Sequence, residues 1–179
     1  MSAVDAPSRS TTAVRCYVAL GANLGDAIAN VCAAAQRIAS LPAIENVVAS
    51  SLYQSAPREI RAVQPDYINA VVGFVSKKTP QELWLALSSI ETVLGRLRSG
   101  TRNEARKIDV DFLLYGGTIL NTPALVLPHP RMTQRAFVLH PLLEIAPDVE
   151  IPGFGRAASL LDGVADQVIR RLDKVALCS

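Results

Sequence analysis

The order of strand-like and helix-like segments is the feature that most limits the folds open to this chain. Alternating or continuous apolar runs bounded by turn residues predict four strands, at residues 14–20, 45–55, 66–76 and 107–116. Apolar residues at helical spacing predict two helices, at residues 26–40 and 79–99. The second helix carries a capping signal at its start, since Thr79 and Pro80 precede Glu82 at the spacing of a capping box.

This order, βαββαβ, is that of a ferredoxin-like sandwich, a mixed α/β fold of the α+β type. Three further elements are expected as C-terminal additions: residues 118–120 pairing back on the fourth strand, a helix at 134–145, and a last helix at 155–175. Residues 1–13 are small and polar, which predicts a disordered lead-in. We therefore expect residues 14–179 to form a single domain.

Composition excludes several classes of protein. A net charge of +2 over 179 residues does not indicate a nucleic-acid binder. The three cysteines are widely spaced and form no CxxC pair, which predicts free thiols of the cytoplasm without a disulfide framework or zinc site. The N-terminal stretch has no secretory apolar region, and Gly, Asn and Pro interrupt the uncharged run 112–127, so we expect no membrane partner. The oligomeric state stays open, with a monomer favoured.

Two aspartates interrupt the apolar strand 107–116. Asp109 and Asp111 are two residues apart, so both carboxylates point to one face, about 6–7 Å from each other. They repel unless a cation lies between them, and a hard ion such as Mg²⁺ suits oxygen ligands. Pairing with nearby arginines is the alternative, and spacing alone does not decide. Alternation places Leu113 and Tyr115 with the acids, and places on the helix-facing side Ile108, Val110, Phe112 and Leu114.

Basic residues gather just before the acid pair. Arginine forks suit phosphate oxygens, so a loop rich in them beside metal-binding acids indicates a polyphosphate site. A solvated end of the second helix is the alternative interpretation. The sequence contains neither a GxxxxGK[ST] loop nor a dinucleotide GxGxxG. The cluster consists of Arg96, Arg98, Arg102, Arg106 and Lys107.

Two other functions share the predicted fold. A ferredoxin-like RNA-binding module needs aromatic residues on its central strands, whereas strand 107–116 carries acids that repel a phosphate backbone. A regulatory ligand-binding domain without catalysis needs no acid pair beside clustered arginines.

Among the histidines, His129 lies between prolines in a loop open to a ligand, whereas His140 lies on a segment expected to pack.

Four blocks of sequence, in order, make the chain resemble the 6-hydroxymethyl-7,8-dihydropterin pyrophosphokinase family of folate biosynthesis. The resemblance implies the fold inferred above and the transfer of pyrophosphate from ATP to the hydroxymethyl group of the pterin, with release of AMP. It covers about residues 14–150. The blocks are LGANLGD (20–26), SLYQSAP with QPDYINAVV (51–57 and 64–72), IETVLGRLR through RKIDVDFLLYG (90–116), and LPHPRMTQRAFVLHPLLEIAPD (127–148).

The resemblance also implies residue roles. Asp109 and Asp111 match the aspartates that hold two Mg²⁺ ions. The catalytic set would be Arg96, Arg106, Asp109 and Asp111. Contacts to ATP would come from Glu91, Arg98, His129 and Arg135. The pterin would be bound by Ser55, Tyr67, Asn69 and Phe137, with the Asn69 side chain hydrogen-bonded to it and the two aromatic rings on its faces.

Overall fold

A computed structural model describes residues 12–57, 64–94 and 107–172. Its centre is an antiparallel sheet in which β4 and β5 flank β1, and β2 and β3 both pair with β4. This is the arrangement of the expected ferredoxin-like fold. The elements of the sheet and its helices are β1 (Val14–Ala22), α1 (Ala27–Ala39), β2 (Ile44–Ala49), β3 (Tyr53–Ser55), β4 (Tyr67–Ser76), α2 (Pro80–Val93) and β5 (Asp109–Tyr115).

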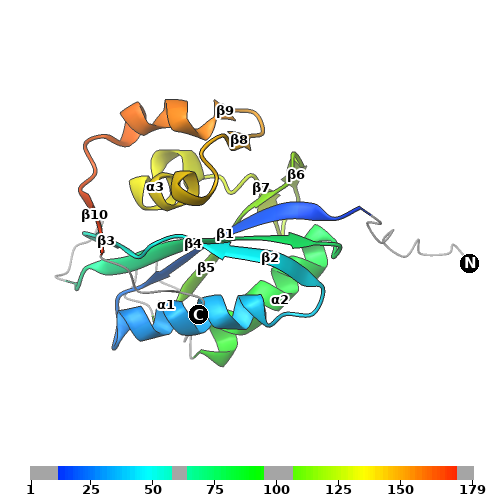
Figure 1. Cartoon of the computed structure of the whole chain (residues 1–179), viewed down its shortest axis with the longest axis horizontal. Helices are drawn as coiled ribbons and strands as arrows, with labels where there is room; N and C mark the ends of the chain where they lie inside the picture. The colour runs from blue at the N-terminus through cyan, green and yellow to red at the C-terminus, as the bar shows by residue number, and fades with distance from the viewer. Residues whose placement is uncertain (1–11, 58–63, 95–106, 173–179) are drawn as a thin grey trace, which may run out of the picture.

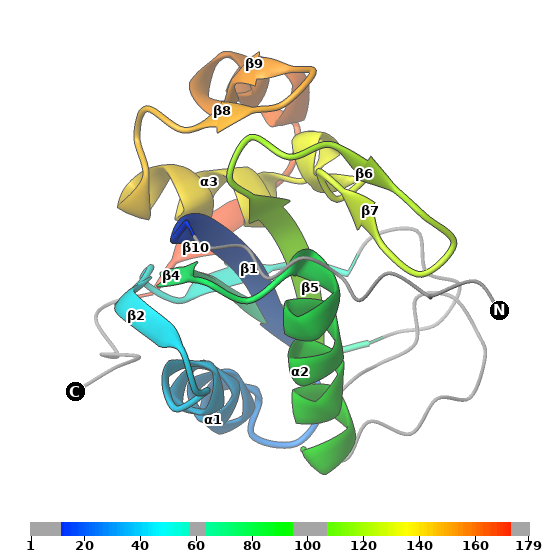
Figure 2. The same cartoon turned by 90° about the vertical axis from the view of Figure 1, so that its right-hand side faces the viewer.

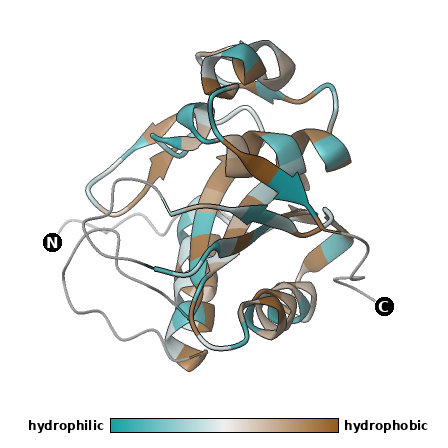
Figure 3. Ribbon diagram, turned by 90° about the vertical axis from the view of Figure 1, so that its left-hand side faces the viewer, coloured by the Kyte–Doolittle hydropathy of each residue, from teal (hydrophilic) through white to brown (hydrophobic). Residues whose placement is uncertain are grey.

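The sheet lies between two layers. Helices α1 and α2 cover one face, and the C-terminal elements cover the other (Figures 1 and 2). Figure 3 shows many hydrophobic residues, in brown, along the strands of the central sheet, as expected for a sheet covered on both faces. The C-terminal elements are β6 (Leu120–Asn121), β7 (Val126–Leu127), η1 (Met132–Gln134), α3 (Ala136–Ile145), β8 (Glu150–Ile151), β9 (Gly155–Arg156), η2 (Ala157–Val164) and β10 (Ile169–Arg171).

Local signals set the helix starts. The Asp26 side chain accepts a hydrogen bond from the Ala29 N–H at the start of α1, and Thr79 and Glu82 form the predicted capping box of α2. Helix α2 ends at Val93, and residues 95–99 of its predicted range lie outside the described residues. In the described part of the chain, no helix is long and apolar enough to cross a membrane.

The strand predicted at 45–55 is in fact two strands. The Ser50 hydroxyl accepts a hydrogen bond from the Val71 N–H at 3.0 Å, while the Ser50 N–H donates to the Val71 carbonyl at 2.9 Å. A side chain thus takes the place of a backbone acceptor, the ladder stops, and β3 begins at Tyr53. The pairing of β2 is also irregular, with Asn46 at a positive φ of 51°.

Strand β5 departs from simple alternation. Its register with β1 shifts so that Tyr17 pairs with Leu114 while Val18 pairs with Phe112. This β-bulge at Leu113 reverses the facing of the last two residues: Leu114 packs on the α3 side, and Tyr115 packs with Phe112 on the α1 and α2 side. The prediction for Leu114 and Tyr115 was therefore wrong, whereas the acids precede the bulge and keep their expected face.

Two predictions for the C-terminal half were also wrong. Residues 118–120 do not pair with β5, because Thr122 and Leu125 close a turn through three hydrogen bonds and β6 pairs with β7 instead. The tail 155–175 is not an α-helix where the structure describes it. Gly155 has a positive φ of 81°, η2 is a 3₁₀ helix, and β10 pairs with the edge strand β3.

Candidate active site

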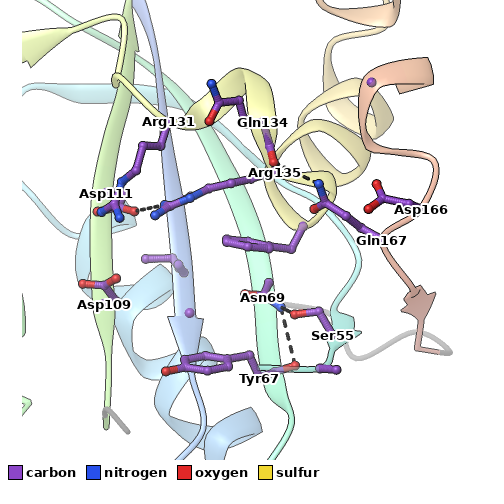
Figure 4. A pocket seen from close by; sticks show the side chains of 16 residues that line it. Ser55, Tyr67, Asn69, Asp109, Asp111, Arg131, Gln134, Arg135, Asp166 and Gln167 are labelled. Atoms are coloured by element: carbon purple, nitrogen blue, oxygen red, sulfur yellow. Dashed lines mark hydrogen bonds and ion pairs between the residues drawn. The ribbon is translucent and has the colours of Figure 1, made fainter. Parts of the chain in front are cut away.

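A cavity of about 380 Å³ opens on the α3 side of the sheet, between the sheet and the start of α3 (Figure 4). Its volume is in the range of small-molecule sites. The sheet contributes one wall and the η1–α3 and η2–β10 connections contribute the other. The lining residues are Ala19, Leu20, Gly21, Ser55, Ala56, Tyr67, Asn69, Asp109, Asp111, Arg131, Gln134, Arg135, Phe137, Gly163, Asp166 and Gln167.

The acid pair lies on the β5 wall of this cavity. Asp109 and Asp111 both line it and are partly buried, as the strand periodicity requires. The Arg135 guanidinium donates a hydrogen bond from Nη1 to Asp111 Oδ2 at 3.1 Å. His129 Nε2 lies 3.7 Å from Asp111 Oδ1. The Arg135 cation and the His129 ring thus both approach the Asp111 carboxylate.

Three paired residues of neighbouring strands connect the acid pair to the amide of Asn69. Gly21 of β1 pairs with Asn69 of β4 on one side and with Asp109 of β5 on the other. Two strand spacings therefore separate the amide from the carboxylate, about 10 Å. A Cβ atom on Gly21 would lie 3.4 Å from Asn69 Oδ1, so a larger residue here would project between the two groups.

The amide wall is fixed by hydrogen bonds. Asn69 is 3% exposed, and its Nδ2 donates to the Tyr53 carbonyl at 3.2 Å and to Ser55 Oγ at 3.0 Å. These bonds determine the orientation of the amide, whose Oδ1 lies on the Gly21 side. Tyr67 and Ser55 line the cavity beside it (Figure 4). An amide held in this way can recognise the polar edge of a flat heterocycle.

The opposite wall comes from the start of α3. Arg135 precedes the helix and Phe137 lies in its first turn. The Arg135 Cζ lies 5.4 Å from the centroid of the Phe137 ring, a cation–π contact, while the same guanidinium reaches Asp111. One side chain therefore couples the aromatic part of the cavity to its acidic part.

His129 is less open than the sequence indicated. Its side chain is 16% exposed, and burial lowers its pKa below the ordinary value, with the Asp111 carboxylate opposing this shift only in part. The Arg131 N–H donates to His129 Nδ1 at 3.2 Å, so the proton of the neutral ring is on Nε2, the atom nearest Asp111. His140 is also partly buried, on α3, and does not line the cavity.

Several predicted residues are not brought into the described cavity. Glu91 is buried on α2, and its Oε1 accepts a hydrogen bond from the Val110 N–H at 2.8 Å, which ties α2 to the acid strand. The structure thus places Glu91 behind the acid pair. The four arginines of the basic cluster fall outside the described residues, and the predicted Arg96, Arg98 and Arg106 are among them.

The acid pair fits a hard divalent cation of the Mg²⁺ type. The two carboxylates share one wall of an open cavity, and no cluster of three or more His, Cys, Asp or Glu suited to a metal occurs among the described residues. An ion held here would need its other ligands from phosphate oxygens and water. That is the usual situation for Mg²⁺, which binds one or two carboxylates together with substrate phosphates.

Other lining residues were missed from the sequence. Arg131 and Gln134 lie within the sequence block 127–148, close to Arg135. That closeness is the feature from which they could have been predicted. Gly163, Asp166 and Gln167 come from the tail that was predicted as a helix. Nothing local marks them, because their place depends on the pairing of β10 with β3, a contact between residues more than 100 positions apart.

Comparison with known proteins gives consistent matches. A family model described as 7,8-dihydro-6-hydroxymethylpterin-pyrophosphokinase (HPPK) matches residues 17–147. The 2-amino-4-hydroxy-6-hydroxymethyldihydropteridine pyrophosphokinase of Pseudomonas aeruginosa is 39% identical over 88% of this chain and 96% of its own. The protein of that name in Haemophilus influenzae is 36% identical over 89% and 99%. Folic acid synthesis protein fol1 of Pneumocystis carinii is 36% identical over 86% of this chain but only 20% of its own.

Comparison with solved structures shows similarity of fold. The Plasmodium falciparum HPPK-DHPS crystal structure with pteroate superposes with a TM-score of 0.66 at 12% identity, over 84% of this chain. The structure with pterin and p-hydroxybenzoate also gives 0.66, at 11% identity over 92%. This chain spans less than half of those longer chains, 42% and 46% respectively.

Proposed function

The chain belongs to the 7,8-dihydro-6-hydroxymethylpterin-pyrophosphokinase family, and we propose that the cavity on the α3 side of the sheet is where it joins its two substrates. The chain is an ATP-dependent pyrophosphokinase of folate biosynthesis, which transfers pyrophosphate from ATP to 6-hydroxymethyl-7,8-dihydropterin and releases AMP. The alternatives of an RNA-binding or purely regulatory domain are not favoured.

One observation carries this assignment. The row Asn69–Gly21–Asp109 places a fixed amide and an acid pair about 10 Å apart across one open cavity. Asn69 would bind the polar edge of the pterin, with Ser55 beside it and the rings of Tyr67 and Phe137 against its faces. The hydroxymethyl group would then extend over Gly21 toward the acids, where the triphosphate is held.

The acid pair would hold Mg²⁺, two ions by family resemblance, and the metal would supply charge neutralisation for the triphosphate. The chain's own residues do the rest. Arg135 and Arg131 bring positive charge to the cavity wall beside the acids, and His129 presents its Nε2 proton at the same place. Arg96, Arg98 and Arg106, which lie outside the described residues, are proposed to contact the phosphates as well. Glu91, on α2, is proposed to support the acid strand β5 through its hydrogen bond to the Val110 N–H.

In the transfer, a bond forms between the pterin hydroxyl oxygen and the β-phosphorus of ATP. The bond from the β-phosphorus to the oxygen of the α-phosphate breaks, AMP leaves with that oxygen, and the hydroxyl proton passes to solvent water. Asn69, which would hold the pterin, and the acid pair, which would hold the triphosphate through metal, together position the hydroxyl in line with that bond. Fixed cationic donors beside the reacting phosphates stabilise the charge that develops on them.

The deciding experiment is product identity. Purified protein is mixed with ATP, Mg²⁺ and 6-hydroxymethyl-7,8-dihydropterin, and the nucleotides and pterins are separated. Equal amounts of AMP and pyrophosphorylated pterin support the proposal. ADP in place of AMP would mean transfer of a single phosphoryl group and would overturn it.

We place the reaction in the cytoplasm, consistent with the free thiols of Cys16 and Cys32.

A further inference from the structure

Helix α3 begins without a side-chain cap of its own. Arg135 occupies the N-cap position in an extended conformation, with φ −127° and ψ 110°, and its side chain makes no capping hydrogen bond. It points instead to Asp111. The next residue, Ala136, is 1% exposed, so its N–H requires a protein partner.

The partner comes from the far end of the chain. Gln167 Oε1 accepts a hydrogen bond from the Ala136 N–H at 2.9 Å, and Gln167 Nε2 donates to the Gln134 carbonyl at 2.9 Å. One carboxamide thus holds the backbone on both sides of Arg135, and Figure 4 shows Gln167 beside Gln134 and Arg135. It satisfies one of the N–H groups at the helix start that have no partner within the helix, while the side chain at the N-cap position points to the site.

Gln167 is itself held by the framework. Its N–H donates to the Val164 carbonyl at 3.0 Å, and β10, which begins two residues later, pairs Ile169 with Ser55 of β3. The side chain therefore reaches α3 from a segment fixed to the same sheet that carries Ser55 and Asn69. Gln167 also lines the main cavity and the smaller one beside Phe137.

We propose that Gln167 is a positioning residue for pyrophosphoryl transfer: by clamping the backbone from Gln134 to Ala136, it sets the direction of Arg135 toward Asp111 and of Phe137 toward the pterin. This inference rests on the proposed function of the cavity. A cap that only stabilises the fold would change the melting temperature and leave the catalytic constants of the folded enzyme unaltered. A positioning residue changes them, because small displacements of site groups cost much of the rate.

The experiment compares Gln167→Met, Gln167→Ala and Gln167→Glu with the wild-type protein. Methionine keeps the length of the side chain and loses both hydrogen bonds, alanine loses everything, and glutamate keeps only the acceptor for the Ala136 N–H. Gln36→Ala is the matched control, since Gln36 is exposed on α1, the helix on the other face of the sheet. Measured quantities are kcat, KM for each substrate, the melting temperature, and the dissociation constant of 6-hydroxymethyl-7,8-dihydropterin from its fluorescence.

We expect kcat/KM to fall about 10-fold to 100-fold in the methionine and alanine variants, with weaker pterin binding, an intermediate loss in the glutamate variant, and no change in the control. A methionine variant with wild-type kcat/KM and pterin affinity would overturn the inference, even if its melting temperature fell. If the wild-type protein produced no AMP, the proposed function would fail, while the ratio of pterin affinities would still test the clamp.

Discussion

Arg135 and Asp111 form an ion pair across the cavity, with Nη1 and Oδ2 3.1 Å apart. They come from different layers of the molecule, since Asp111 lies on β5 of the sheet and Arg135 precedes α3. Their side chains are 18% and 25% exposed, so the pair is shielded from water on most sides. The contact places a cation beside the carboxylates proposed to hold metal, where the phosphates would bind.

Replacing Arg135 should therefore impair chemistry more than folding. We expect Arg135→Ala to lower kcat about 10²-fold to 10³-fold, because a fixed cation beside the reacting phosphates is lost. Arg135→Lys should recover only part of this, since an ammonium cannot reproduce the planar guanidinium over Phe137. Steady-state kinetics with Arg156→Ala, which breaks the exposed ion pair with Asp148, provides the control. Equal kinetics of Arg135→Ala and the control would contradict the role.

The acid pair gives the strongest prediction. Asp109→Ala and Asp111→Ala should each reduce turnover at least about 10³-fold and leave the fold intact, because both carboxylates line an open cavity and not the packed core. Product formation and circular dichroism measure the two effects. Asp148→Ala, at an exposed position, is the control. Near-normal turnover in both site variants would refute the metal assignment.

Metal removal tests the same assignment without mutation. In EDTA we expect no AMP formation, and we expect activity to return on addition of Mg²⁺ in excess of the chelator. The melting temperature of the protein alone should change little, because two carboxylates without phosphate ligands bind Mg²⁺ weakly. Turnover that persists in the chelator would mean that the acids have another role.

Gly21 should be intolerant of bulk. A side chain at this position would project between Asn69 and the acid wall, where the hydroxymethyl group is proposed to pass. We expect Gly21→Val to raise KM for the pterin at least about 10-fold, while valine suits a strand and preserves folding. Gly117→Val is the control, since nothing lies within 4 Å of a Cβ there. An unchanged KM for Gly21→Val would place the pterin elsewhere.

The sequence predicted those parts of the structure that depend on local pattern. The order of the main strands and the two helices on one face of the sheet, the capping box of α2 and the shared face of Asp109 and Asp111 follow from periodicity and capping chemistry. Asn69 came from the family resemblance, because a buried asparagine in an apolar strand has no recognisable period of its own.

What the sequence did not reveal depends on contacts between distant segments. The bulge at Leu113 results from how β5 fits β1, and the strand at Ile169–Arg171 exists because β3 offers a free edge. Gln167 gained its place in the same way. A three-residue strand after a 3₁₀ helix carries too little periodicity to be distinguished from a helix.

Glu144 on α3 forms a second cluster of this long-range kind. Its carboxylate accepts hydrogen bonds from the Ser51 N–H at 3.0 Å, the Ser51 hydroxyl at 2.7 Å and the Tyr53 hydroxyl at 2.9 Å, and Arg171 of β10 lies 2.8 Å away. Burial alone would raise the pKa of Glu144, but these donors more than offset it and lower the pKa below its ordinary value. The cluster ties α3, β3 and β10 together.

Stability should therefore depend on the ionised form of Glu144. We expect Glu144→Gln to lower the free energy of unfolding by about 1–3 kcal/mol at pH 7, because hydrogen bonds to a charged acceptor are replaced by weaker ones. Since the folded-state pKa lies below the unfolded value of about 4.3, the contribution is fully present above that pH. It is lost as the pH falls through the folded-state pKa. Urea unfolding of both proteins between pH 7 and pH 3 should show a constant difference down to about pH 5 that narrows below about pH 4, whereas a difference independent of pH would mean that shape, not charge, is what Glu144 contributes.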